Sequence, residues 1–414
     1  YFGNWTSGDS FSIYSDGVTI HMSQNGVERV ATPDFNYTYF FDAIQSSSPF
    51  NGSFTCTNIR FYPTGRYVPG SLSNGQDNFS VAGGTNSPLF YSYDGKVWIQ
   101  ALNNPFGINS SIKSIAYNGS YWLAVGNNAQ NSNNVAISTD GINWQAKDSN
   151  LFDNGVANAV AWNGSYWLIV GQHNSGGATI LASPDGINWQ AANNNPFAGG
   201  DATSVAWNGA YWVAVGKDVT NQTGQAVSYD GMNWQAANNN PFVNWPTSGV
   251  AWSASGSYWL ALGFNNGNVD TAAISYDGLN WTYANNSPFA DNGTQAAWNG
   301  TTWAAVGYAL GAPAISTSPD GLNWTPVANV PITGGPMSIT WNGALFVVVG
   351  DGANSIATSP DGQTWTAQRN PNGATTLGVV ASKRSAASNQ LQVGPTGPME
   401  IGRASCRERV SSPV

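Results

Sequence analysis

Charge is what this sequence has least of. Only 8% of its 414 residues are Asp, Glu, Lys or Arg, against roughly a quarter in an ordinary soluble domain. With 13 Lys plus Arg facing 22 Asp plus Glu, no basic surface can neutralise phosphates, which excludes nucleic acid and anionic membranes as partners. Arginine is missing between Arg66 and Arg369, and Glu28 is the only glutamate before position 400.

The residues that build metal and redox sites are equally scarce. Cys56 and Cys406 are too few for a disulfide framework, and the two histidines, His21 and His173, stand alone in the sequence. We therefore expect no metal site, no catalytic triad and no cofactor.

Long apolar runs are absent as well. No stretch approaches the ~18 consecutive apolar residues of a membrane span, so no membrane insertion is predicted. The chain opens at Tyr1 rather than at a methionine, which predicts that a secretion signal has been removed. The expected location is therefore extracellular, either secreted or exposed on a cell or virion surface.

Aromatic residues and glycine are abundant in place of charge. The chain holds 19 Trp, 17 Tyr and 17 Phe, together with 48 Gly. A disordered chain would have few aromatics and much charge. Because Gly, Asn, Ser and Thr favour turns and strands over helices, the composition predicts an all-β fold.

A short repeat organises the chain. The segment Asp-Gly-x-x-Trp recurs seven times at intervals of 41 to 47 residues. Its copies begin at Asp94, Asp140, Asp185, Asp230, Asp277, Asp320 and Asp361 and close on Trp98, Trp144, Trp189, Trp234, Trp281, Trp324 and Trp365. A period of this length is typical of solenoids and propellers, so the unit has to be analysed strand by strand.

One unit contains four short β-rich runs, namely Thr203 to Trp207, Tyr211 to Val215, Gln225 to Tyr229 and Asn233 to Ala237. Asn208-Gly209, between the first two runs, is typical of a two-residue type I′ hairpin. Four antiparallel strands in each repeat of about 45 residues predict the blade of a β-propeller. A solenoid is disfavoured because its coils are shorter and joined in parallel.

The ends of the chain predict how the ring closes. Residues 15–20 form a degenerate copy of the turn with Asp16 in the aspartate position, so 1–57 is interpreted as an N-terminal half-blade with an irregular insertion. Residues 58–370 hold the seven repeats, and 371–394 supply a C-terminal half-blade. Two strands from each end would form a split closing blade that buries both sheet edges. This gives eight blades, with seven as the alternative.

The tail, residues 395–414, does not continue the repeat. Within it, residues 400–410 carry three arginines and resemble a translated sequencing adaptor. We expect this segment to lie outside the propeller and to be foreign to the natural protein.

The run Ser-x-Asp-Gly-x-x-Trp, as in residues 183–189, resembles the Asp-box (BNR repeat) of sialidase-type propellers. The usual box is Ser-x-Asp-x-Gly-x-Thr-Trp, so these copies are one residue shorter, between the Asp and the Gly. The resemblance implies a propeller whose boxes are structural turns between outer strands, away from the ligand face. It does not imply an active sialidase, because that reaction needs an arginine cluster and most of the repeats contain none.

Elementary chemistry assigns the same roles to the box residues. The Asp carboxylate can accept bonds from the backbone N–H groups of its own turn, the Gly takes a positive φ, and the Trp covers the core of the blade. These aspartates are therefore interpreted as structural turn residues.

No catalytic residue is assigned. A glycosidase needs two carboxyl groups at a set separation, and Asp153, Asp201 and Asp291 fall in the same linker of the repeat. Solvated loop residues are the favoured interpretation, and a glycoside hydrolase that uses Asp pairs stays as an alternative.

Tyr-Trp pairs such as Tyr166-Trp167 and Tyr211-Trp212 recur at one position of the repeat. As platforms for sugar rings they would indicate a carbohydrate-binding, lectin-like head, which is a second alternative. Their fixed place favours core packing, and since successive strand residues face opposite sides, at most one ring of each pair can be free.

Sequons outside the repeat are the candidate N-glycosylation sites of a secreted chain. They are Asn4, Asn36, Asn51, Asn78, Asn109 and Asn221.

Together these features predict a non-enzymatic, secreted or surface-exposed β-propeller with a structural or adhesive role. Its terminal strands can pair within one chain or across neighbours. The expected partners are therefore further copies of the chain, by strand exchange or lateral assembly into a filament or array, and glycans.

Overall fold

A computed structural model describes residues 11–15, 20–24, 27–31, 78–107, 110–127, 135–147, 151–153, 155–220, 222–243, 245–264, 271–309, 312–371 and 376–382. The chain divides into two compact units, one of residues 77–392 and the other of 1–76 with 393–414. In the second unit, β1 (Phe11–Ser15), β2 (Ile20–Gln24) and β3 (Val27–Ala31) form an antiparallel sheet of their own. Across the described ranges, no helix could span a membrane.

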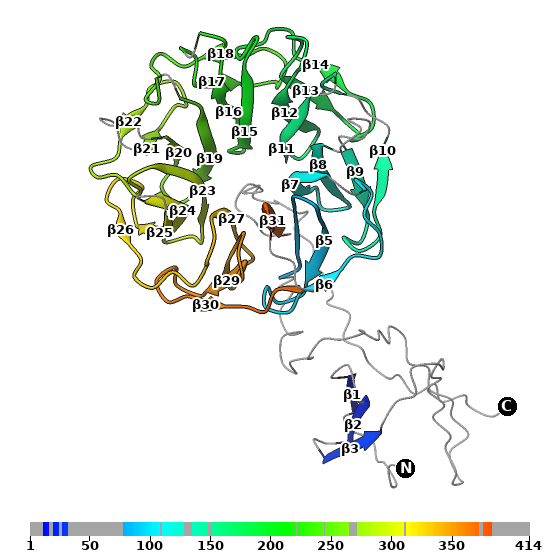
Figure 1. Cartoon of the computed structure of the whole chain (residues 1–414). Coiled ribbons are helices and arrows are strands. Elements are labelled where there is room, and N and C mark those ends of the chain that lie inside the picture. The colour runs from blue at the N-terminus through cyan, green and yellow to red at the C-terminus, as the bar shows by residue number, and fades with distance from the viewer. Residues whose placement is uncertain are drawn as a thin grey trace, which may run out of the picture. The chain divides into compact units, whose positions relative to one another are not determined.

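Residues 77–392 form a seven-bladed β-propeller of four-stranded antiparallel sheets (Figure 1). Blades 1 to 3 are β7 (Ser111–Tyr117), β8 (Trp122–Asn127), β9 (Val135–Ser138) and β10 (Gln145–Lys147); β11 (Val156–Trp162), β12 (Trp167–Gln172), β13 (Ile180–Ser183) and β14 (Gln190–Ala191); and β15 (Asp201–Trp207), β16 (Trp212–Lys217), β17 (Gln225–Ser228) and β18 (Gln235–Ala236). Blades 4 to 6 are β19 (Thr247–Ser253), β20 (Tyr258–Gly263), β21 (Ala272–Ser275) and β22 (Thr282–Tyr283); β23 (Asn292–Trp298), β24 (Trp303–Ala309), β25 (Ala312–Ser318) and β26 (Thr325–Pro326); and β27 (Pro336–Trp341), β28 (Phe346–Gly350), β29 (Ile356–Ser359) and β30 (Thr366–Ala367). The predicted all-β propeller is therefore confirmed.

The closing blade combines both ends of the ring. Its strands run in the order β31 (Val379–Ser382), β4 (Ser80–Gly84), β5 (Ser87–Ser92) and β6 (Ile99–Gln100). A split closing blade was predicted, but not this one: it takes one strand from the C-terminal side and three from the first repeat, whereas β1 to β3 of the predicted N-terminal half-blade, 1–57, form a sheet of their own. The prediction of eight blades was wrong and the alternative of seven is correct, because β31 supplies the first strand of the repeat that carries Asp94. Of the predicted C-terminal half-blade, 371–394, residues 383–394 lie outside the described residues.

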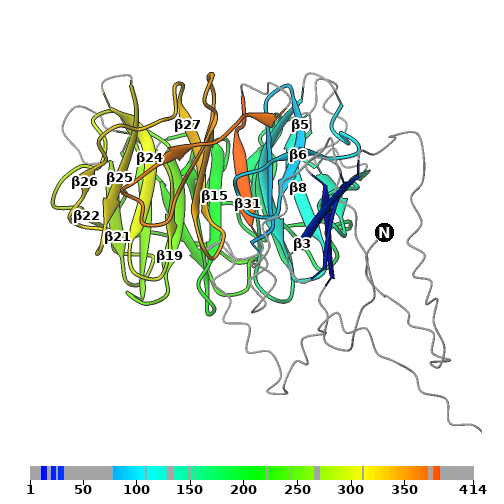
Figure 2. The same cartoon turned by 90° about the horizontal axis from the view of Figure 1, so that it is seen from below.

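The loops gather on two faces of the ring. Figure 2 shows the ring from the side, with the strands of each blade running between these faces. Because the strands are antiparallel, the hairpin after the first strand and the Asp-Gly turn after the third lie on one face, which we call the box face. The loops after the second and fourth strands lie on the opposite, linker face.

The first hairpin of blade 3 differs from its prediction. The last pair of β15 and β16 is Trp207 with Trp212, so the loop has four residues rather than two. The Asn208 side-chain oxygen accepts bonds from the N–H groups of Ala210 (2.9 Å) and Tyr211 (2.8 Å). This Asx turn removes the need for a positive φ at Asn208, whereas Gly209 has a φ of 100°.

The core is built from the second strand of each blade and the rings that cover it. Tryptophans on this strand are fully buried in five neighbouring blades, namely Trp122, Trp167, Trp212, Trp259 and Trp303. This confirms core packing for the tryptophan of each Tyr-Trp pair. In four of the linkers between blades, a proline is followed by a phenylalanine whose ring is buried. These rings form a second buried layer and belong to Phe106, Phe197, Phe242 and Phe289. Burial of such large rings, at about 25 cal/mol per Å² of apolar surface, takes the place of ionic stabilisation.

Candidate functional site

The box carboxylates are occupied by their own turns. In blade 3, Asp230 Oδ1 accepts bonds from the N–H groups of Met232 (2.8 Å) and Asn233 (2.7 Å) and from the Ser228 hydroxyl (3.1 Å). Asp230 Oδ2 accepts a bond from the Asn233 amide at 2.8 Å. These bonds, that of the Asn233 backbone first, lower the pKa of Asp230 to about 2.

The same pattern recurs around the ring. The carboxylate accepts two backbone N–H bonds in all seven described boxes, at Asp94, Asp140, Asp185, Asp230, Asp277, Asp320 and Asp361. The glycine that follows each of them has a positive φ of 71° to 79°. Asp16 lies outside the described residues. An anion saturated by backbone donors is a turn element and a poor proton acceptor for a substrate.

The box tryptophans follow one pattern with a single exception. Six indole N–H groups donate to the carbonyl of their own box glycine at 2.8 to 3.1 Å, those of Trp98, Trp144, Trp234, Trp281, Trp324 and Trp365. The exception is Trp189 in blade 2, whose indole N–H has no partner and whose ring is half-buried. Of the other six, only Trp365 is also half-buried.

An asparagine in the linker that follows one blade holds the box tryptophan of the next blade. We call this contact the asparagine clamp. Asn194, two residues before the Pro of its linker, accepts from the N–H of Trp234 (2.8 Å) and donates to the Trp234 carbonyl (2.7 Å). The same clamp holds three further box tryptophans, from Asn103, Asn239 and Asn286. In the linker that precedes blade 2, Ser149 occupies this sequence position. Among the described residues, no asparagine clamps Trp189.

A relay of tyrosines and tryptophans crosses the blade interfaces. The Tyr166 hydroxyl of blade 2 accepts a bond from the Trp212 indole of blade 3 at 2.9 Å. Equivalent bonds run from Trp167 to Tyr121, from Trp259 to Tyr211 and from Trp303 to Tyr258. The relay is interrupted at the closing blade, where Phe79 takes the tyrosine position and the buried Trp122 indole N–H has no partner.

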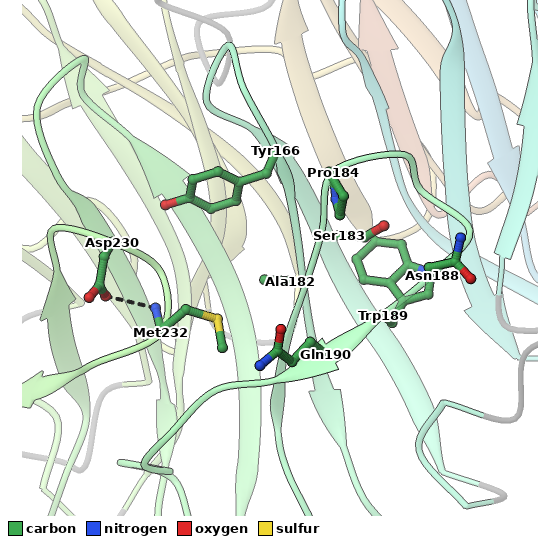
Figure 3. Close-up of a pocket in the computed structure, with 9 residues that line it drawn as sticks. All are labelled: Tyr166, Ala182, Ser183, Pro184, Asn188, Trp189, Gln190, Asp230 and Met232. Atoms are coloured by element: carbon green, nitrogen blue, oxygen red, sulfur yellow. Dashed lines mark hydrogen bonds between the residues drawn. The ribbon is translucent and has the colours of Figure 1, made fainter.

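A groove of about 390 Å³ opens beside Trp189, between blades 2 and 3. Figure 3 shows Tyr166, Trp189, Gln190 and Met232 around Ala182. The rest of its wall is formed by Ser183, Pro184, Asn188 and Asp230. No Lys, Arg or His lines it.

The linker face carries a second polar feature. Asp201, at the start of β15, is paired across the sheet with Lys217, and its Oδ1 accepts a bond from Asn158 of blade 2 at 2.6 Å. Burial raises the pKa of Asp201 to about 6, against the opposing effects of Lys217, Asn158 and Lys113.

The remaining candidate residues do not form a catalytic cluster. The carboxylate of Asp153 accepts a bond from the hydroxyl of Ser175, within its own blade. Among the described residues, no group of three or more His, Cys, Asp or Glu could hold a metal. Of the glycosylation candidates only Asn78 is described, and its side-chain oxygen is buried without a partner. Asn4, Asn36, Asn51, Asn109 and Asn221 lie outside the described residues.

Sequence reasoning missed the relay, the clamp and the groove. The relay had a signal, because Tyr precedes Trp at the start of four second strands and Phe79 stands in that position before β4. The clamp also had one, in the asparagine that recurs two residues before the linker proline. Nothing in the sequence distinguished the box of blade 2, since Ser183 to Trp189 matches its neighbours.

No protein-family model and no curated protein matches the chain. Solved structures do resemble it. A Bacteroides uniformis protein named as a candidate 6-phosphogluconolactonase aligns with a TM-score of 0.52 and 13% identity, over 73% of this chain and 98% of its own. YCF48 bound to a D1 peptide gives 0.47 and 16%, over 65% and 85%, and the WD40 propeller domain of Doa1 gives 0.44 and 12%, over 64% and 85%. At these identities the likeness concerns the fold alone.

Proposed function

We propose that this chain is a non-enzymatic β-propeller with a structural or adhesive role on an extracellular, cell or virion surface, built from a shortened variant of the Asp-box repeat. The observation that carries the proposal is the state of the carboxylates. All seven described box aspartates are saturated by their own turns, and Asp153 and Asp201 have partners of their own. The low charge and the neutral, amide-rich turns suit a surface that packs or adheres.

The non-enzymatic part is tested against the hydrolase alternative. We expect a panel of aryl glycosides to show no turnover by the purified chain. Turnover that disappears in Asp201→Asn or Asp153→Asn would establish the hydrolase instead, because those variants remove candidate carboxyl groups from two adjacent linkers.

Self-assembly is proposed through the closing blade. Its first strand, β31, has four residues, all of them buried, and pairs Ala381 with Val81. A strand this short, delivered from the far end of the ring, can complete either its own blade or that of a second copy.

Cysteine pairing distinguishes the two arrangements. Two single variants, Val81→Cys and Ala381→Cys, are made in a Cys56→Ser, Cys406→Ser background, mixed as unfolded chains and refolded together. A disulfide-linked mixed dimer is expected if strands exchange, since the paired positions lie opposite each other in the sheet. Absence of the mixed dimer, with an internal disulfide in the Val81→Cys/Ala381→Cys double variant, would refute exchange.

The secreted location predicts occupied sequons. Intact mass should fall after glycosidase treatment of the protein from a eukaryotic host, and peptide mapping should place the loss at one or more of the six candidates. We expect Asn78 to stay unmodified, because its side-chain oxygen is buried. An unchanged mass would remove glycosylation from the proposal.

A further inference from the structure

The groove beside Trp189 lies where, among the described boxes, the bond between the box tryptophan and its glycine is missing. Every other described box tryptophan is held by a bond to its own glycine, whereas Trp189 has no bond at its indole nitrogen and its ring is half-buried. The missing clamp is not sufficient to explain this, because no asparagine in the described part of the chain clamps Trp98 either, and Trp98 keeps its bond to Gly95 at 3.0 Å. The half-buried Trp189 ring packs against a core cluster that includes Leu123 and Val125, and it also lines the groove.

We propose that this groove is a binding site for a neutral pyranose of a glycan chain, with the Trp189 ring as the stacking platform. The inference rests on the proposed adhesive role and gives that role a site and a ligand class. The volume of about 390 Å³ lies within the range of small-ligand sites.

The chemistry of the wall selects the ligand. Trp189, Tyr166 and Met232 offer apolar and aromatic surface, which matches the C–H face of a pyranose ring. Gln190 carries an amide that donates and accepts, as sugar hydroxyls require, and the Asn188 amide, whose nitrogen donates to Asp185 at 2.7 Å, adds its oxygen as an acceptor.

Charge excludes the anionic sugars. The groove has no cationic residue, and its one carboxylate, Asp230, is bonded to its own turn. An acidic sugar would therefore meet no counter-charge there, on a chain whose net charge is −9. A neutral ligand needs none.

The repeat supplies matched controls. Gln145, Gln190 and Gln235 occupy the same exposed position after three successive box tryptophans, but only Gln190 lines the groove. Trp365 is half-buried like Trp189, yet its indole is bonded to Gly362 at 2.8 Å.

The experiment is calorimetric titration of the full chain with cellohexaose, mannohexaose and laminarihexaose, and with sialyllactose and a proline decapeptide as competitors of different chemistry. We expect at least one neutral hexasaccharide to bind. Trp189→Ala should weaken it by about tenfold or more, and Gln190→Ala by about three- to tenfold. Trp365→Ala and Gln235→Ala should each change the affinity by less than about twofold.

Several results would overturn the site. They are binding by none of the three neutral probes, binding by sialyllactose or the proline peptide alone, or neutral binding that Trp189→Ala and Gln190→Ala leave intact. Gln190→Ala keeps the test decisive if Trp189→Ala does not fold. Strand-exchange cross-linking is read separately, so failure of the glycan site and failure of the proposed assembly are distinguishable.

Discussion

Phe79 offers the sharpest test of how the blades are joined. Tyr166, Tyr211 and Tyr258 accept bonds from the Trp of the next blade at 2.8 to 3.1 Å. At the closing blade, Phe79 lies with its ring centroid 5.7 Å from that of Trp122, close to the 5.9 Å that separates Tyr166 from Trp212. Phe79→Tyr would therefore place a hydroxyl where the unpartnered Trp122 indole N–H needs an acceptor.

The expected gain follows from that one bond. A net intramolecular hydrogen bond contributes about 1 kcal/mol, and satisfying a buried donor recovers up to about 3 kcal/mol. For a unit of this size, 1 kcal/mol corresponds to a rise in Tm of about 1–2 °C. Urea unfolding followed by tryptophan fluorescence measures the difference in the free energy of unfolding.

Two controls isolate the bond. Tyr166→Phe removes the acceptor of Trp212 and should cost about 1–3 kcal/mol. In a Trp122→Phe background, Phe79→Tyr should bring no gain, because the donor is gone. A Phe79→Tyr variant that is no more stable than the parent, or equally stabilised in both backgrounds, would refute the relay.

Three further predictions concern the clamp and the two kinds of aspartate. Asn194→Ala should lower the free energy of unfolding by about 1–3 kcal/mol, because both polar backbone groups of Trp234 lose a partner. The control, Asn193→Ala, loses one exposed amide contact. It should lower the free energy of unfolding by less than about 0.5 kcal/mol in the same urea assay. Burial raises the pKa of Asp201 from 3.8 to about 6, so ionisation of this group lowers the stability of the fold as the pH rises through that range. Asp201→Asn should be more stable than the parent by about 1–2 kcal/mol at pH 8 and about equal to it at pH 3.5. Identical pH profiles of the two proteins would contradict this. The pKa of Asp230 is lowered from 3.8 to about 2, so its stabilisation is present above pH 3.8 and lost on acidification towards pH 2; Asp230→Asn should flatten that part of the acid-unfolding profile, and a profile as steep as the parent's would count against the box bonds.

The boxes made the fold predictable from the sequence. Each box joins the third and fourth strands of one blade, so seven well-formed boxes set seven blades. The degenerate copy at Asp16 misled the count, since β1 and β2 on either side of it belong to the separate sheet. The predicted C-terminal half-blade, 371–394, does supply a first strand, β31, but its partner was wrongly predicted, because any exposed edge of a blade satisfies the same alternating pattern.

The groove could not be predicted, for a physical reason. The box of blade 2 has the same sequence pattern as its neighbours, and the half-buried position of Trp189 involves packing against a cluster with residues far away in the chain, such as Leu123 and Val125. The regular recurrence of a Tyr-Trp pair in the repeat predicts that its tryptophan is buried. A missing hydrogen bond at the indole nitrogen of a single tryptophan leaves no such pattern in the local sequence.

The division of the closing blade has a consequence for engineering the chain. Ser382 pairs with Ser80 as the last pair of β31 and β4, the register that Trp207 and Trp212 occupy beside the Asn208 hairpin of blade 3. The closing blade thus has no first hairpin. Cutting the first hairpin of another blade would divide that blade in the same way, with one strand from one end of the chain and three from the other, and we call this division the seam. A circular permutant opened after Asn208, with an Asn-Gly loop joining Ser382 to Asn78, should fold into the same ring, so the seam belongs to the chain's connectivity rather than to any one blade.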